Sequence, residues 1–197
     1  MITTPLWTLI TVQIALGAFD TLFHHEFGER LAWRQSQRRE LQLHGARNLF
    51  YAALLAGIGY FQLLGVLAWI IAAVLVVELC VTLVDFVEED RTRKLPASER
   101  VTHTLMALNY GAILALLAPV LAQWAGHPTG LRYADNGLWA VLMALSAFGV
   151  TLFGIRDLLA SRRLARMASV PAESLFAGAM PRQAVLVTNM PPGLSIR

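Results

Sequence analysis

The sequence is short of charge. Only 15% of its 197 residues are Asp, Glu, Lys or Arg, whereas soluble domains carry about 25%. The shortage is concentrated, because residues 1–19, 48–77, 104–131 and 136–155 contain no charged side chain. About 20 mostly apolar residues are enough for a helix to cross a bilayer. A soluble globular domain is therefore excluded, and the sequence predicts an all-α integral membrane bundle.

Cysteine is almost absent as well. The single Cys80 excludes an intrachain disulfide, and its apolar surroundings favour a packing role. No basic segment precedes the first apolar run, and no small-x-small cleavage site precedes Asp20. These two absences argue against a cleaved signal peptide, so we expect the first run to be a helix of the mature protein.

The apolar runs predict five membrane helices, at residues 5–27, 44–62, 65–87, 101–123 and 137–158. Residues 48–77 would make about 45 Å of helix, too long for one span. We therefore expect this run to break in a turn near Gln62–Gly65. The sequence predicts one bundle domain, residues 1–166. It also predicts a flexible C-terminal tail, residues 167–197, because that segment contains four prolines.

The basic residues support this division. Fifteen of the 16 lie in segments 28–47, 87–100 and 156–197, which five helices place on one side of the membrane; only Arg132 lies on the other. The positive-inside rule makes the arginine-rich side cytoplasmic. We therefore expect an external N-terminus, a cytoplasmic C-terminus and a location in a bacterial inner membrane. The excess of basic residues reports topology and does not indicate nucleic-acid binding.

The informative polar residues recur in pairs. The pattern acid-x3-His occurs three times, and residues four apart lie on one face of a helix. Counting 1.5 Å per residue from the outer helix ends brings these pairs to one depth near the cytoplasmic edge. A polar stripe on the third helix reaches the same depth. The pairs are Asp20/His24, Glu40/His44 and Glu99/His103, and the stripe is Glu78, Thr82, Asp85 and Glu89.

Such residues are costly on membrane helices and usually face the bundle interior. Carboxylates combined with imidazoles suit iron, manganese or zinc, and di-iron bundles draw both from four facing helices. We therefore predict two metal ions, most simply iron, and two catalytic candidates, Glu78 as a proton relay and Tyr110 as a hydrogen-bond donor. The predicted metal ligands are Asp20, His24, Glu40, His44, Asp85, Glu99 and His103.

Other polar residues receive plainer interpretations. His25 cannot share an α-helical face with His24, so we expect it to contact headgroups or neighbouring side chains. Glu89 belongs to an acidic run, residues 88–90, which we expect to be solvated or paired with arginines. His127 lies in an outer loop and is expected to be structural.

This chemistry resembles that of membrane di-iron hydroxylases and desaturases. The chain lacks their clustered HxxHH and HxxxH boxes, so no residue assignment carries over from them. The function that we favour is an oxidoreductase acting on a lipid-like or other hydrophobic substrate, with membrane lipids and a soluble electron donor as partners.

Three alternatives stay open at this point. One is a zinc-dependent hydrolase or isomerase, in which the metal lowers the pKa of a bound water. Another is a non-enzymatic subunit of a larger membrane complex, with the acidic and basic groups forming an interfacial charge network. The third is a b-type haem protein, which the surplus of carboxylates disfavours.

Overall fold

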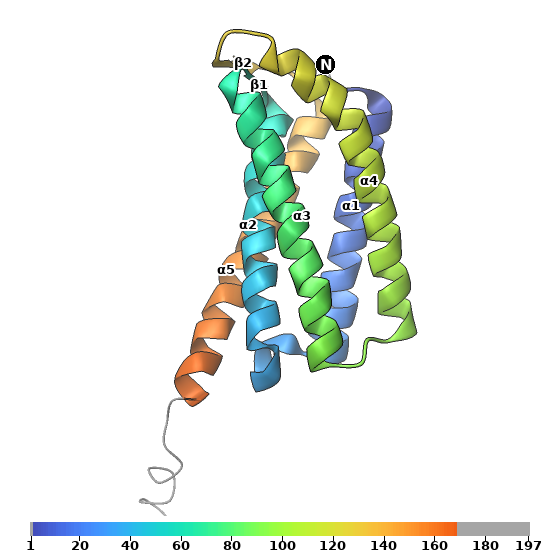
Figure 1. Cartoon of the computed structure of the whole chain (residues 1–197), viewed down its shortest axis with the longest axis vertical. Helices are drawn as coiled ribbons and strands as arrows, with labels where there is room; N and C mark the ends of the chain where they lie inside the picture. The colour runs from blue at the N-terminus through green and yellow to red at the C-terminus, as the bar shows by residue number, and fades with distance from the viewer. Residues whose placement is uncertain (1, 169–197) are drawn as a thin grey trace, which may run out of the picture.

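The described part of the chain contains five long helices (Figure 1), as the sequence predicts. The structure is a computed structural model and describes residues 2–168. The predicted tail therefore lies outside the described residues from residue 169 onward. The helices are α1 (Thr4–Phe19), which continues as a π-helix (Asp20–Glu29), α2 (Arg38–Tyr60), α3 (Val66–Thr92), α4 (Ala97–Ala125) and α5 (Leu138–Ala168). Two short 3-10 turns, Leu31–Trp33 and Gln35–Gln37, lead from the π-helix into α2.

Four of the helical segments are long and apolar enough to cross a membrane: Thr4–Glu29, Val66–Thr92, Ala97–Ala125 and Leu138–Ala168. Their outward faces expose large apolar side chains such as Val76, Leu108 and Leu152. Continuous exposed apolar surface of this kind suits contact with lipid. The protein is therefore a multi-pass membrane protein. Helix α2 carries charged residues in its first turns, and a fifth span there stays a prediction.

The predicted break in the long apolar run lies where expected, but it is extended chain. Strand β1 (Phe61–Leu64) follows α2 and pairs antiparallel with β2 (Gly130–Tyr133), with Phe61 opposite Tyr133. Gly65 then adopts a φ of +61°, and a Cβ there would lie 2.5 Å from Oγ1 of Thr129. Only glycine fits this conformation and this space. We call this end of the bundle the strand end, and the opposite end, where α2 and α4 begin, the polar end.

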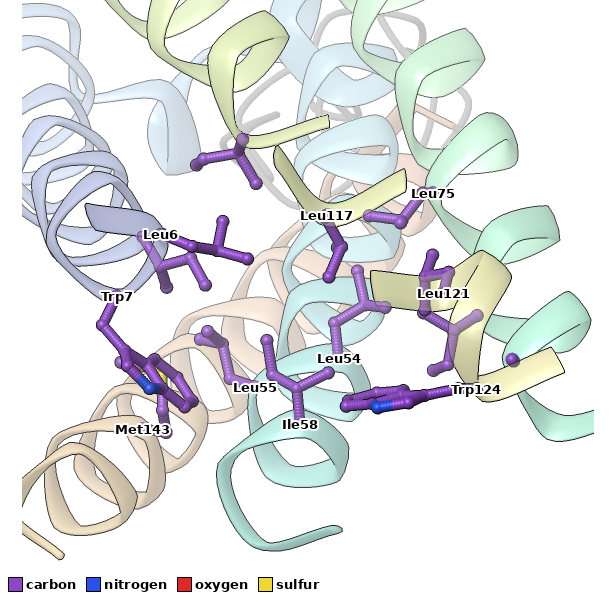
Figure 2. Close-up of a cluster of buried hydrophobic side chains, with 14 of the residues drawn as sticks. Leu6, Trp7, Leu54, Leu55, Ile58, Leu75, Leu117, Leu121, Trp124 and Met143 are labelled. Atoms are coloured by element: carbon purple, nitrogen blue, oxygen red, sulfur yellow. The ribbon is translucent and has the colours of Figure 1, made fainter. Parts of the chain in front are cut away.

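The apolar core occupies the strand end. Figure 2 shows Leu54, Leu55 and Ile58 of α2 among Trp7 of α1, Trp124 of α4 and Met143 of α5. Trp7 also stacks on Trp139 of α5, with ring centroids 5.9 Å apart. These contacts hold α1 and α5 together at the strand end. Toward the polar end the two helices diverge (Figure 1).

Helices α2 and α5 approach each other closely at two glycines. A Cβ on Gly45 would lie 2.7 Å from Cγ of Leu158 and 3.0 Å from the carbonyl oxygen of Gly154. A Cβ on Gly154 would lie 3.1 Å from the carbonyl oxygen of Gly45. Small residues allow membrane helices to pack at such distances. This contact positions the first turns of α2, which carry part of the centre described below.

Replacing Gly45 by leucine is expected to destabilise the bundle by about 1–3 kcal/mol, the usual cost of forcing extra atoms into packed space. The matched control is Gly111→Leu on α4, where an added Cβ has no neighbour within 4 Å. Thermal unfolding in detergent measures both variants. Equal melting temperatures for the two would contradict the close approach of α2 and α5.

Candidate metal centre

The polar end gathers buried carboxylates and imidazoles from the π-helix, α2, α3 and α4. Within residues 2–168 they form two groups, each containing four residues whose ligand atoms all lie within 4.8 Å of one another. Ligands on opposite sides of an ion are separated by twice the metal–ligand distance, roughly 4.2 Å. Each group could therefore hold a metal ion after small movements. The groups are Asp20, His25, Glu99 and His103, and His25, Glu40, His44 and Glu89.

His25 belongs to both groups because residues 20–29 form a π-helix. In a π-helix the backbone bonds run from residue i to i+5, so a turn contains more residues than an α-helical turn. Asp20 can then face both His24, four residues on, and His25, five residues on. All three are buried, with exposures of 1%, 4% and 3%. Of the two contacts expected for His25, that with headgroups is wrong, because the expectation assumed α-helical geometry, whereas His25 does contact neighbouring side chains.

The first group surrounds Asp20. Its Oδ2 atom lies 3.3 Å from Nε2 of His103 and 3.5 Å from Nε2 of His25. The same nitrogen of His25 lies 3.4 Å from Oε1 of Glu99. Two helical segments far apart in the sequence, the π-helix and α4, thus meet at one point.

The second group surrounds His44. Its ring lies 4.3 Å from that of His25, centroid to centroid, and its Nε2 lies 3.2 Å from Oδ2 of Asp85. Arg47 lies 3.1 Å from the same nitrogen through Nη2, and Nη1 lies 3.1 Å from Asp85. A guanidinium can only donate, so the contact with Arg47 needs Nε2 of His44 as an acceptor, whereas a hydrogen bond to Asp85 would need it as a donor. An unprotonated imidazole nitrogen is also the form that binds metals.

Glu89 belongs to the second group and also faces the first. Its Oε1 is 3.9 Å from Nε2 of His44, and its Oε2 is 3.5 Å from Nδ1 of His103. One oxygen therefore faces each group, as in a carboxylate that bridges two metal ions. The sequence contained this signal, since Glu89 is the last residue of the polar stripe on the third helix.

Several buried atoms at the centre lack a hydrogen-bond partner among residues 2–168. They are both carboxylate oxygens of Glu89, both of Asp85, and Nε2 of His25. Arg47 approaches Asp85 closely, but not in hydrogen-bonding geometry. Leaving such atoms unpaired is costly, and a cation beside them would remove that cost. The chemistry of the donors and their missing partners both fit a metal ion.

The charges at the centre lead to the same conclusion. Five buried carboxylates face two guanidinium groups, so an excess of three negative charges remains when all five carboxylates are ionised and the histidines are neutral. In a medium of low dielectric such an excess is relieved by bound cations or by protons on these groups. The carboxylates are Asp20, Glu40, Asp85, Glu89 and Glu99, and the guanidiniums belong to Arg47 and Arg93.

Arg93 neutralises part of the centre. It follows α3, and its Nη2 lies 3.0 Å from Oε1 of Glu40 and 2.6 Å from Oε1 of Glu99. Burial lowers the pKa of Arg93, but its hydrogen bonds to Glu99 and Glu40 outweigh burial and raise the pKa above its ordinary value. Arg93 is therefore a fixed positive charge that links one carboxylate from each group.

The structure brings five of the seven predicted ligands into the two groups, namely Asp20, Glu40, His44, Glu99 and His103. His24 and Asp85 lie beside the groups. Nδ1 of His24 is 2.9 Å from Oδ1 of Asp20, and its Nε2 is 3.2 Å from the hydroxyl of Ser98. Both ring nitrogens thus have partners, which suits a residue that orients Asp20. Sequence reasoning missed His25, Glu89, Arg47 and Arg93 as parts of the centre.

The two predicted catalytic residues lie farther along the bundle. Glu78 is fully buried in α3 and accepts a hydrogen bond from Thr82 at 2.8 Å, while its Oε2 has no hydrogen-bond partner in the described part of the chain. The hydroxyl of Tyr110 donates to the carbonyl oxygen of Leu75 at 3.3 Å. Tyr110 and Tyr51 both lie near enough to Glu78 to interact with its charge. Neither predicted residue belongs to the two groups.

An apolar cavity of about 400 Å³ begins beside the centre and runs toward the strand end. Its wall includes Asp20 and Arg47 at the polar end, and Ile58 and Leu117 farther along. Tyr110 also lines it. The volume lies within the range of small-molecule sites, about 300–1,000 Å³. Asp20 thus belongs both to a candidate metal group and to the wall of this cavity.

The fold and the centre together define a multi-pass helical membrane protein with buried His/Asp/Glu clusters that could bind metal. The identity of the metal does not follow from these residues alone, because iron, manganese and zinc all accept this set of donors. Comparisons with protein-family models, with curated proteins and with solved structures found no match to the chain.

Proposed function

We propose that the protein is a membrane di-iron oxidoreductase that hydroxylates or desaturates a hydrophobic substrate at the cytoplasmic edge of the bilayer. One observation carries the proposal: two adjacent His/carboxylate groups share His25 and adjoin an apolar cavity through Asp20. Metals beside a substrate-sized apolar space are the arrangement that oxidation of an unactivated C–H bond needs.

The residues have distinct roles in this proposal. The two groups would hold the ions, and the ions would supply the redox chemistry that activates O₂. In a hydroxylation, one oxygen atom enters the substrate C–H bond and the other leaves as water, with two electrons and two protons supplied from outside. Glu78, which lies near Tyr51 and Tyr110 of the cavity wall, would carry protons, and Tyr110 would donate a hydrogen bond within the cavity.

The electrons would come from a soluble donor. Exposed basic residues surround the polar end, among them Arg38, Arg91, Lys94 and Arg100. A cluster of positive charges at a surface steers acidic partners toward it. This side of the protein is the cytoplasmic side in the predicted topology, where reduced donors are present. An acidic reductant is therefore the partner that we propose.

The contacts of Arg93 favour a second candidate, a non-enzymatic subunit in which the polar end is a charge network. Arg93 already pairs with Glu40 and Glu99, as a structural network would require. A haem protein is less well supported. Axial histidines need an open space for the porphyrin between them, whereas Glu89 lies between His44 and His103.

Elemental analysis separates these candidates. Protein purified in detergent from iron- and zinc-replete cells is expected to carry near-stoichiometric iron. The iron content is expected to fall in His44→Ala and in His103→Ala, because each removes a ligand from one group. His127→Ala, in the exposed loop after α4, is the control and should leave the content unchanged. Zinc in place of iron would favour a hydrolase or isomerase, and wild-type protein without metal would leave the subunit as the better candidate.

A further inference from the structure

The cavity is long and mostly apolar, and the charged residues in its wall, Asp20 and Arg47, lie at one end. From Arg47 to Ile58 on α2 the wall rises eleven residues, or roughly 16 Å, about the length of an extended alkyl chain of twelve carbons. Leu54, Leu55 and Ile58 line this length. The buried aromatic residues Trp7 and Trp124 belong to the core at the strand end (Figure 2). The strand end of the cavity therefore offers mainly apolar contacts and no charged side chain.

The polar end of the cavity offers neutral hydrogen-bonding groups together with one charge of each sign. Thr21 and Asn48 line it beside Asp20 and Arg47. The guanidinium of Arg47 is already held by Asp85 and His44. An anionic head would be repelled by the carboxylate of Asp20, and a cationic head would be repelled by the guanidinium of Arg47. An uncharged head, such as a hydroxyl or carbonyl group, meets neither difficulty.

The cavity is open on its side toward the membrane. Helix α1 packs chiefly against α4, while α5 packs chiefly against α2, and α1 and α5 diverge toward the polar end (Figure 1). Leu22 and Leu145 line the cavity and are also exposed, at 45% and 66%. A chain can therefore pass from the bilayer into the cavity between α1 and α5 without crossing water, on the strand-end side of the ion pair that joins Glu26 to Arg156.

We infer that this cavity binds a single-chain amphiphile with an uncharged polar head, its head beside Asp20 and its tail toward the strand end. An amphiphile in the leaflet nearest the polar end already has this orientation, so it can enter without turning over. The carbons next to the head then lie nearest the two His/carboxylate groups. That these carbons would be the ones oxidised rests on the proposed function, whereas the binding pose does not.

Photo-crosslinking tests the pose directly. Two fatty-alcohol probes of about twelve carbons would carry a diazirine beside the hydroxyl or at the far end of the chain. Each is reacted with the purified protein, and labelled residues are mapped by mass spectrometry. The head-side probe is expected to label residues near Thr21 and Asn48, and the tail-side probe residues near Ile58 and Leu117. The reverse order, or labelling confined to the outward-facing Val76 and Leu108, would overturn the inference.

Two glycine variants provide a matched pair. Gly149 lines the cavity and Gly111 does not, and an added Cβ has no neighbour within 4 Å at either position. Gly149→Phe is expected to reduce cavity labelling about ten-fold by filling space, and Gly111→Phe to leave it unchanged. If Gly149→Phe does not fold, the two-probe pattern in the wild type still decides the pose. If the protein carries no metal but shows the expected labelling, the amphiphile site is supported and the enzyme proposal is contradicted. If it binds iron but shows no labelling in the cavity, the enzyme proposal is supported and the amphiphile site is contradicted.

Discussion

Replacing His25 by alanine is expected to weaken metal binding at both positions of the centre together. His25 is the one residue that the two groups share, so its loss leaves each with three members. Loss of even a supporting contact commonly costs ten- to a hundred-fold in metal affinity, and loss of a ligand should cost at least about a hundred-fold. Competition with a chelator, followed by metal analysis, measures the affinity.

The pattern across variants is more telling than the size of the effect. His44→Ala should weaken the binding of one ion and leave the binding of the other unchanged, because His44 belongs to a single group. His24→Ala should cause a smaller loss, since His24 contacts Asp20 without belonging to either group. If His25→Ala behaves like His127→Ala, the π-helix does not bring His25 to a metal.

Replacing Arg93 by methionine is expected to have opposite consequences with and without metal. Arg93 neutralises Glu40 and Glu99, and removing one partner of a buried ion pair costs about 3–5 kcal/mol. In chelator, the variant should therefore unfold at a markedly lower temperature than the wild type. Added metal should restore much of the loss, because the freed carboxylates can then bind the ions more strongly. Thermal unfolding in detergent, with chelator and with added iron or zinc, measures both effects.

A charge network without metal gives a different result. Arg93→Met would then be unstable under all conditions, and added metal would not rescue it. Arg91→Met is the control, because Arg91 is exposed near the end of α3. Its melting temperature should match that of the wild type with or without metal.

The apolar runs predicted the helices well because a bilayer leaves the chain few choices. Backbone groups in lipid must be paired internally, so a long apolar run becomes a helix. The run 48–77 broke near Gly65, as its length required, although nothing in its composition indicated that β1 would pair with a strand more than 60 residues later. The i, i+4 spacing likewise predicted which faces of the helices meet at the polar end.

The centre itself was harder to predict, for reasons that differ from residue to residue. His25 depends on a backbone conformation that side-chain periodicity does not reveal. Glu89 was hidden between two other acids, Glu88 and Asp90, which suggested a solvated run. Arg47 and Arg93 were counted as charges that mark the cytoplasmic side, and such a count does not separate exposed arginines from buried ones. Their burial becomes visible only when four helices are placed together.

Because residues 20–29 form a π-helix, the number of residues in this segment matters as well as their identity. A π-helical segment contains more residues than an α-helix of the same rise, so it behaves as an α-helix that has accepted an insertion. Removing one residue between Asp20 and His24 would let the segment relax to α-helix, and His25 would then stand four residues after Asp20. The histidine that now orients the carboxylate would be replaced by the one that now joins the two groups. Chain length, as much as side-chain chemistry, thus determines how many histidines this segment brings to the interior.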